Sequence, residues 1–132
     1  DLNTLSEQLE AGETTILDIV SNVDDTPANR QKLSHVIGIE RWGQKRLQVP
    51  LGEPLRMEEY NEYRPKREAS MSELIPLFSE TRQATVAIAN QLTAVPNVLD
   101  QVVEHNDMGA MRIGTWLAYL DMHSTYELRN VK

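Results

Sequence analysis

The sequence contains no cysteine and only three histidines. The absence of thiols excludes disulfide scaffolds, iron–sulfur clusters, cysteine-based zinc sites and cysteine nucleophiles. Any metal site in this chain must therefore be built from histidine and carboxylate side chains.

Basic residues are also in deficit, and long apolar runs are missing. The chain has 13 Lys and Arg against 20 Asp and Glu, a formal charge of −7, and its basic residues alternate with acidic ones. Affinity for nucleic acid depends on clustered Lys and Arg, so no nucleic-acid partner is expected.

No apolar run approaches the roughly 20 residues of a membrane span, and residues 1–4 lack the basic start and apolar stretch of a signal peptide. We expect a cytoplasmic protein without a membrane partner.

Length and composition are those of one folded domain over residues 1–132. With 40% hydrophobic and 25% charged residues, the chain can bury a core without disulfide or metal staples. Apolar residues recur at spacings of three and four from Leu2 until the segment 22–27, which predicts a first helix. Thr26 followed by Pro27 is typical of an N-cap with proline at the first helical position, so a second helix is predicted from Pro27 to about Leu47.

The second half of the sequence predicts two more helices after a long connection. Residues 48–69 are rich in Pro, Gly and charge, which predicts a crossover that connects more than it packs, with a short helix at 57–63. Ser70 and Glu73 match a capping box that opens a third helix, and Pro76 predicts either a late start or a distorted first turn.

Pro96 and Asn97 end the third helix. Residues 98–103 are expected to form a further turn or two, residues 105–109 a loop, and the last helix to run from near Ile113 almost to the C-terminus. No strand is expected. The predicted fold is all-α, a four-helix bundle with a long crossover connection between its second and third helices.

One pair of side chains on the last helix suggests metal chemistry. His123 and Glu127 are four residues apart, which places them on one face of the helix, and they continue the stripe of Trp116 and Leu120. His35 on the second helix completes a set of two imidazoles and one carboxylate, which leaves open positions for water or substrate on Zn, Ni, Mn or Fe. Each member has an ordinary alternative, because a histidine in a bundle is often only hydrogen-bonded and Glu127 can pair with Arg129 or Lys132.

Two segments carry a resemblance to a known family. The run from Lys32 through His35 to Trp42, and the run from Met108-Gly109 through Gly114-Thr115-Trp116-Leu117 to Met122-His123, resemble the DinB/YfiT-like superfamily of bacterial four-helix bundles. The resemblance extends over nearly the whole chain in the order and spacing of elements, and it implies a divalent metal held by three histidines. His35 and His123 match two of them, whereas Glu127 stands at the third. Arg112 stands where the family commonly has a helix-capping Thr or Ser.

The resemblance implies two alternatives for function. The first is a metal-dependent enzyme of the thiol S-transferase or hydrolase type, with a low-molecular-weight thiol as a cosubstrate or another small-molecule substrate. The second is a non-catalytic, dimerising stress or binding protein with a degenerate metal site. A homodimer is expected under both alternatives.

Further side chains are weaker candidates for the site or its surroundings. His105 is expected to hydrogen-bond backbone or water from a loop, and Glu40 either to support the site or to pair with Gln44 or Arg41. Trp42 lies on the same sector of the second helix as His35. The last helix also carries a stripe that is expected to pack in the core or a dimer; its members are Tyr119, Met122 and Tyr126.

Overall fold

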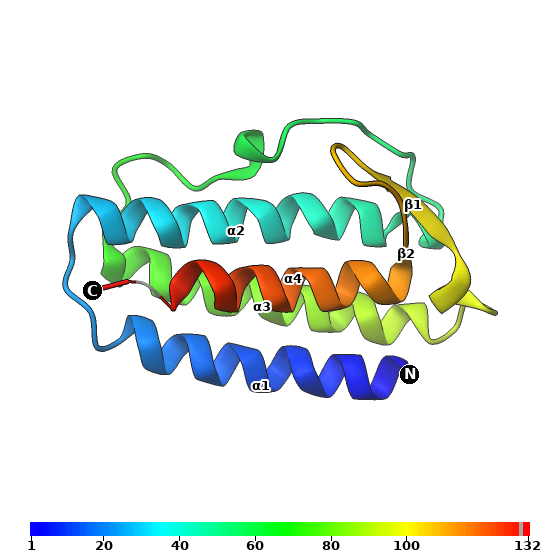
Figure 1. The fold of residues 1–132 in the computed structure, drawn as a ribbon, viewed down its shortest axis with the longest axis horizontal. Helices are drawn as coiled ribbons and strands as arrows, with labels where there is room; N and C mark the ends of the chain where they lie inside the picture. Colours follow the sequence, from blue (N-terminus) through cyan, green and yellow to red (C-terminus); the bar gives the residue numbers. More distant parts are fainter. Residues whose placement is uncertain (130) are drawn as a thin grey trace.

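Four long helices and one small β-hairpin make up the regular structure of the described residues, 1–129 and 131–132, in this computed structural model (Figure 1). The helices are α1 (Leu2–Val20), α2 (Pro27–Leu47), α3 (Met71–Leu92) and α4 (Ile113–Leu128). Helices α1 and α4 run in one direction and α2 and α3 in the other (Figure 1). The most extensive contacts join α2 with α3, α1 with α3, α1 with α4 and α2 with α4, so each helix packs against two neighbours.

The predicted capping residues set the helix starts. The Thr26 hydroxyl accepts a hydrogen bond from the Asn29 amide ahead of Pro27, and Ser70 and Glu73 form the complete capping box of α3. Helix α3 begins directly at Met71 with Pro76 inside it, so the late start is wrong. Proline at that position removes one i→i−4 hydrogen bond, to the carbonyl of the exposed residue Ser72, which water can replace.

The connection between α2 and α3 packs more than the sequence predicts. It contains two 3₁₀ turns, Val49–Leu51 and Tyr60–Tyr63, the second lying within the predicted short helix. It runs back along α2 in Figure 1, where the Trp42 indole donates to the Glu58 carbonyl at 3.0 Å and Arg64 Nε donates to Ser34 Oγ at 3.2 Å. These bonds hold the connection against the outer side of α2.

The expectation that the chain has no strand is wrong. A 3₁₀ turn at Val98–Asp100 is followed by strand β1 (Val102–His105), which pairs antiparallel with β2 (Gly109–Arg112). Each strand has only four residues, too few for an alternating pattern to stand out, and Gly109 supplies a positive φ of 73° at the turn. Arg112 precedes α4 without a side-chain cap; the Ile113 amide donates instead to the Gln101 carbonyl at 2.9 Å.

The interior consists of two apolar clusters with a buried ion pair between them. One cluster includes Trp42 and Trp116, and the other includes Leu33 and Phe78. Between them the Arg82 guanidinium donates to both carboxylate oxygens of Glu40 at 2.9 Å, and both side chains are almost inaccessible to solvent. A buried ion pair is tolerated only where its remaining polar groups are also hydrogen-bonded. Arg82 meets this requirement by donating also to the Leu9 carbonyl, the Asp121 carboxylate and the Ser124 hydroxyl.

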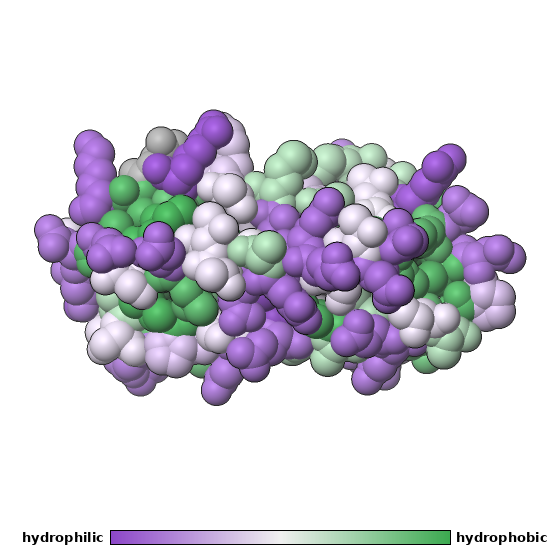
Figure 2. Space-filling model, turned by 90° about the horizontal axis from the view of Figure 1, so that it is seen from below, coloured by the Kyte–Doolittle hydropathy of each residue, from purple (hydrophilic) through white to green (hydrophobic). Residues whose placement is uncertain are grey.

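The hydropathy of the outer surface varies from one region to another. The face on the side of α1 carries polar side chains that separate two apolar areas (Figure 2). Within the part of the chain that is described, no helix has the length and apolar character needed to cross a membrane.

Candidate metal centre

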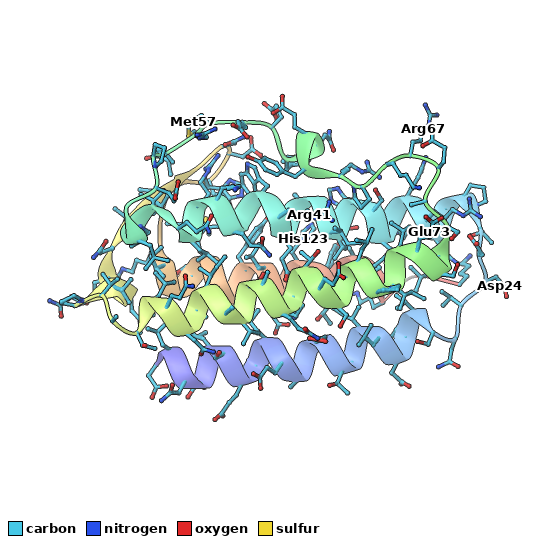
Figure 3. The ribbon with its side chains drawn as sticks, turned by 180° about the vertical axis from the view of Figure 1, so that it is seen from behind. Asp24, Arg41, Met57, Arg67, Glu73 and His123 are labelled. Carbon is cyan, nitrogen blue, oxygen red and sulfur yellow. The ribbon has the colours of Figure 1, made fainter. Side chains whose placement is uncertain are left out.

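His35, His123 and Glu127 come together at the junction of α2 and α4. One ligand atom from each can be chosen so that all three lie within 4.8 Å of one another. The imidazole centroids of His35 and His123 are 5.2 Å apart, and His123 Nε2 lies 3.8 Å from Glu127 Oε1. In Figure 3, His123 lies near the middle of the molecule, between α2 and α4. This group can hold a metal ion.

The local sequence explains why these side chains meet. Leu120, Ser124 and Leu128 form the buried seam of α4, so the residues one position before each of the three lie on an adjoining stripe. That stripe consists of Tyr119, His123 and Glu127, all partly buried. The interpretation that His123 and Glu127 continue the core seam is therefore wrong by one position, and they lie beside the core instead of in it.

Partial burial governs the charge state of the two imidazoles. Burial lowers the pKa of His123 to about 4, the neighbouring His35 acts in the same direction, and the Glu127 carboxylate opposes both. Burial also lowers the pKa of His35, with Glu127 opposing and the cations Arg64 and Lys32 adding to the lowering. Both imidazoles are therefore neutral at pH 7, which is the form that ligates a metal.

Glu127 supplies the negative charge of the group. Its side chain is 28% exposed, and its Oε1 lies 3.8 Å from Nε2 of the neutral His123 ring. The alternative pairing with Arg129 or Lys132 is not observed among the described residues. The carboxylate is thus directed toward the imidazoles while it remains accessible from outside.

Two tyrosines border the group. The Tyr119 ring lies 5.7 Å from that of His123, and the Tyr60 ring meets His35 edge-on at 5.9 Å. Burial raises the pKa of Tyr119, with Tyr60, Asp107 and Glu127 adding to the effect. The spacing of four residues from Tyr119 to His123 is a signal that could have identified Tyr119, whereas Tyr60 comes from the distant connection and leaves no such signal.

The other candidates lie elsewhere. His105 ends β1 and is buried, so its expected place in a loop is wrong; its Nδ1 accepts from the amides of Asp107 and Met108, which confirms the expected backbone hydrogen bonding. Its ring packs 4.9 Å from Trp42, which is itself buried. Glu40 bonds Arg82 and Thr85 instead of Gln44 or Arg41, so both of its oxygens are occupied within the core.

The predicted stripe of Tyr119, Met122 and Tyr126 separates into two parts. Tyr119 packs against His105 and His123, whereas Met122 is 67% exposed and Tyr126 58% exposed. The Arg129 guanidinium lies 4.6 Å from the centroid of the Tyr126 ring. Tyr126 is therefore mainly a surface side chain, unlike Tyr119.

A shallow groove of about 420 Å³ gives access to the group. His35 and Glu127 lie in its wall together with Gln31, Lys32 and Arg64. Arg64 is a residue that the sequence did not single out, because only the packing of the connection brings it to the metal centre.

Comparison of the chain with protein-family models, with curated proteins and with solved structures gives no match. The function must therefore be inferred from the arrangement of His35, His123, Glu127 and their surroundings.

Proposed function

We propose that this chain is a DinB-like four-helix bundle with a long crossover, and that it is a metal-dependent enzyme of the thiol S-transferase or hydrolase type. The observation that carries the proposal is the convergence of His35, His123 and Glu127, whose ligand atoms lie within 4.8 Å of one another. Ligand atoms bound to one Zn²⁺ at about 2.0–2.2 Å stand roughly 3–3.5 Å apart, so small side-chain rotations bring the three into a coordination shell.

The donor set suits a catalytic ion. Two neutral imidazoles and one carboxylate leave net positive charge on a bound Zn, Ni, Mn or Fe ion and leave positions open for water or substrate. Such an ion lowers the pKa of a bound water or thiol, which provides a nucleophile near neutral pH. The groove beside His35 and Glu127 supplies the access that a small substrate or a low-molecular-weight thiol requires.

The chain's own residues shape what reaches this centre. The Tyr60 ring packs against the His35 imidazole and the Tyr119 ring against that of His123, which limits the approach of water to both. Arg64 and Lys32 lie in the wall of the groove and favour an anionic molecule at its mouth.

Metal analysis tests the proposal. Protein purified without an affinity tag is compared with the His35→Ala/His123→Ala double variant after equal exposure to Zn²⁺, Ni²⁺, Mn²⁺ and Fe²⁺ and removal of free ions. We expect close to one ion per chain in the unmodified protein and a large loss in the variant. Equal, negligible metal in both proteins would refute a metal-dependent activity.

A second candidate function is a non-catalytic binding protein that acts as a dimer. Met122 and Tyr126 favour it, because these two large side chains lie one turn apart on α4 and remain exposed. Under this alternative the metal is absent and self-association is retained, so the metal analysis distinguishes the two functions.

A further inference from the structure

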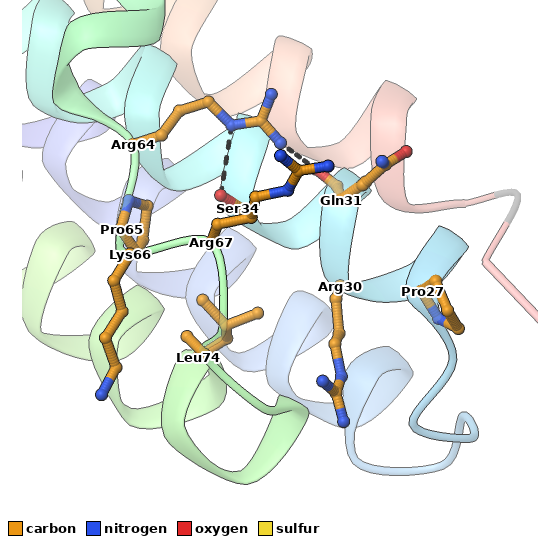
Figure 4. A pocket seen from close by; sticks show the side chains of 10 residues that line it. Pro27, Arg30, Gln31, Ser34, Arg64, Pro65, Lys66, Arg67 and Leu74 are labelled. Carbon is orange, nitrogen blue, oxygen red and sulfur yellow. Dashed lines mark hydrogen bonds between the residues drawn. The ribbon is translucent and has the colours of Figure 1, made fainter.

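A cavity of about 560 Å³ lies beside the groove of the metal centre, between the first half of α2 and residues 64–67 (Figure 4). Four of the 13 basic residues of this acidic chain line it, namely Arg30, Arg64, Lys66 and Arg67. No Asp or Glu is among its lining residues. Its size is that of a pocket for a small molecule.

Two of the four cations are matched by carboxylates, and two are not. Asp25 accepts from Arg30 Nη2 at 2.9 Å, and Glu73 lies 3.3 Å from Lys66 Nζ. Within the described part of the chain, neither Arg64 nor Arg67 has a carboxylate within ion-pair distance. Figure 4 shows the side chains of Arg64 and Arg67 extending toward Gln31, whereas Lys66 and Arg30 point elsewhere. The pocket therefore keeps an excess of positive charge at one end.

Two hydrogen bonds to α2 hold Arg64 in place. Its Nε donates to Ser34 Oγ at 3.2 Å and its Nη2 donates to the Gln31 carbonyl at 3.0 Å. The absence of a side chain at Gly38 allows this approach, because a Cβ there would lie 2.7 Å from Arg64 Cγ. The remaining N–H groups of the guanidinium are free to donate to a ligand, and a fixed guanidinium binds carboxylate or phosphate at a low entropic cost.

The pocket and the metal centre share a wall. Gln31 and Arg64 line both the basic pocket and the groove that contains His35 and Glu127. Burial lowers the pKa of His35, and the charge of Arg64 adds to that lowering. The same guanidinium thus borders both the pocket and the groove in which His35 lies.

We propose that Arg64 and Arg67 bind the carboxylate or phosphate group of a small anionic molecule whose other end reaches the metal centre. Only the reach of the bound molecule to the metal centre rests on the proposed function. The anion site itself requires no metal, and the same donors serve a free phosphate or a carboxylate.

The experiment is a titration of the metal-free full chain, kept in chelator at constant pH and ionic strength. Inorganic phosphate and succinate are added separately, and the backbone and histidine signals are followed by NMR. We expect saturable shifts at residues 31–34 and 64–67, and the relative affinities of the two probes separate phosphate from carboxylate recognition. Because a hydrogen bond to a charged group contributes about 1.5–3 kcal/mol, Arg64→Gln and Arg67→Gln should each weaken binding about tenfold or more.

Arg112→Gln is the matched control, since Arg112 is exposed on β2 away from the pocket. Equal affinity in the wild type, Arg67→Gln and Arg112→Gln, or shifts that chloride reproduces at the same ionic strength, would overturn the anion site. Saturation with succinate, whose second carboxylate can extend past Arg64, that leaves the His35 ring signal unmoved would overturn the link to the metal centre. The metal content of the wild type is measured separately. Saturable anion binding by a wild type that holds no metal identifies a failure of the proposed function alone, and metal binding without anion binding identifies a failure of the anion site alone.

Discussion

The His35 and His123 rings lie 5.2 Å apart, on α2 and α4 respectively. The two residues are far apart in the chain, and only the packing of α2 against α4 brings them together. Among the described residues, the carboxylate that groups with this pair is that of Glu127. The negative charge that favours a cation there thus comes from this residue.

Glu127→Gln therefore tests whether this carboxylate binds the metal ion. We expect the variant to lose metal affinity by about 10- to 100-fold, as disturbance of a coordination site typically does. Competition with a chromogenic chelator measures the change. Glu10→Gln on the exposed side of α1 is the control and should bind as the wild type does. Unchanged affinity in Glu127→Gln would remove the carboxylate from the ligand set.

The stability of the metal-free protein should depend on pH through His123. The pKa of His123 is about 4 in the folded chain and 6.5 for the unperturbed group, so the unfolded chain binds more protons between these values. The contribution of His123 is fully present above pH 6.5 and is lost as the pH falls from 6.5 toward 4, by about 3 kcal/mol in total. Urea unfolding of the wild type and His123→Gln measures it, and the variant should show the shallower decline between pH 7 and 4.5. Parallel declines would contradict the burial of a neutral His123.

The buried pair of Glu40 and Arg82 should be the most sensitive charged contact in the core. Arg82→Met leaves the Glu40 carboxylate buried and unpaired, and we expect it to lower the free energy of unfolding by about 3–5 kcal/mol. Glu40→Gln combined with Arg82→Met should cost less than Arg82→Met alone, because no unpaired charge remains. Arg30→Gln, which breaks the exposed pair with Asp25, is the control, with an expected effect below about 1 kcal/mol.

The sequence predicts the parts of this fold that local patterns encode. The Thr26 and Ser70 caps gave the starts of α2 and α3, and the i,i+4 spacing placed His123 and Glu127 on one face. The sequence does not identify Arg82 as the partner of Glu40, because spacing along the chain identifies neighbours on the same helix and not residues that meet across a core. The β-hairpin is not predicted for a related reason, because strands of four residues leave no periodic signal. The long-range contacts that bring Tyr60 and Arg64 to the metal centre leave none either.

Self-association through α4 can be tested at its exposed apolar pair. If the expected homodimer forms there, Met122→Lys/Tyr126→Lys should place like charges in the interface and give a monomer by light scattering coupled to gel filtration. Met57→Lys, at another exposed methionine, which lies in the connection, should leave the mass unchanged. A monomeric wild type, or a double variant that remains dimeric, would exclude this surface.

Gly38 links the packing of the connection to the anion pocket. A Cβ at this position would lie 2.7 Å from Arg64 Cγ and 3.4 Å from its Cα, so Gly38→Ala must shift Arg64, whose guanidinium bonds Ser34. We expect the substitution to lower the free energy of unfolding by about 1–3 kcal/mol through overpacking and to weaken phosphate binding in the same sample. Gly114→Ala is the control, because a Cβ there meets Leu99 only at 3.5 Å and a helical alanine is favoured over glycine by up to about 1 kcal/mol. Phosphate affinity that is unchanged in Gly38→Ala while its stability falls would show that Arg64 does not need its present position to bind the anion.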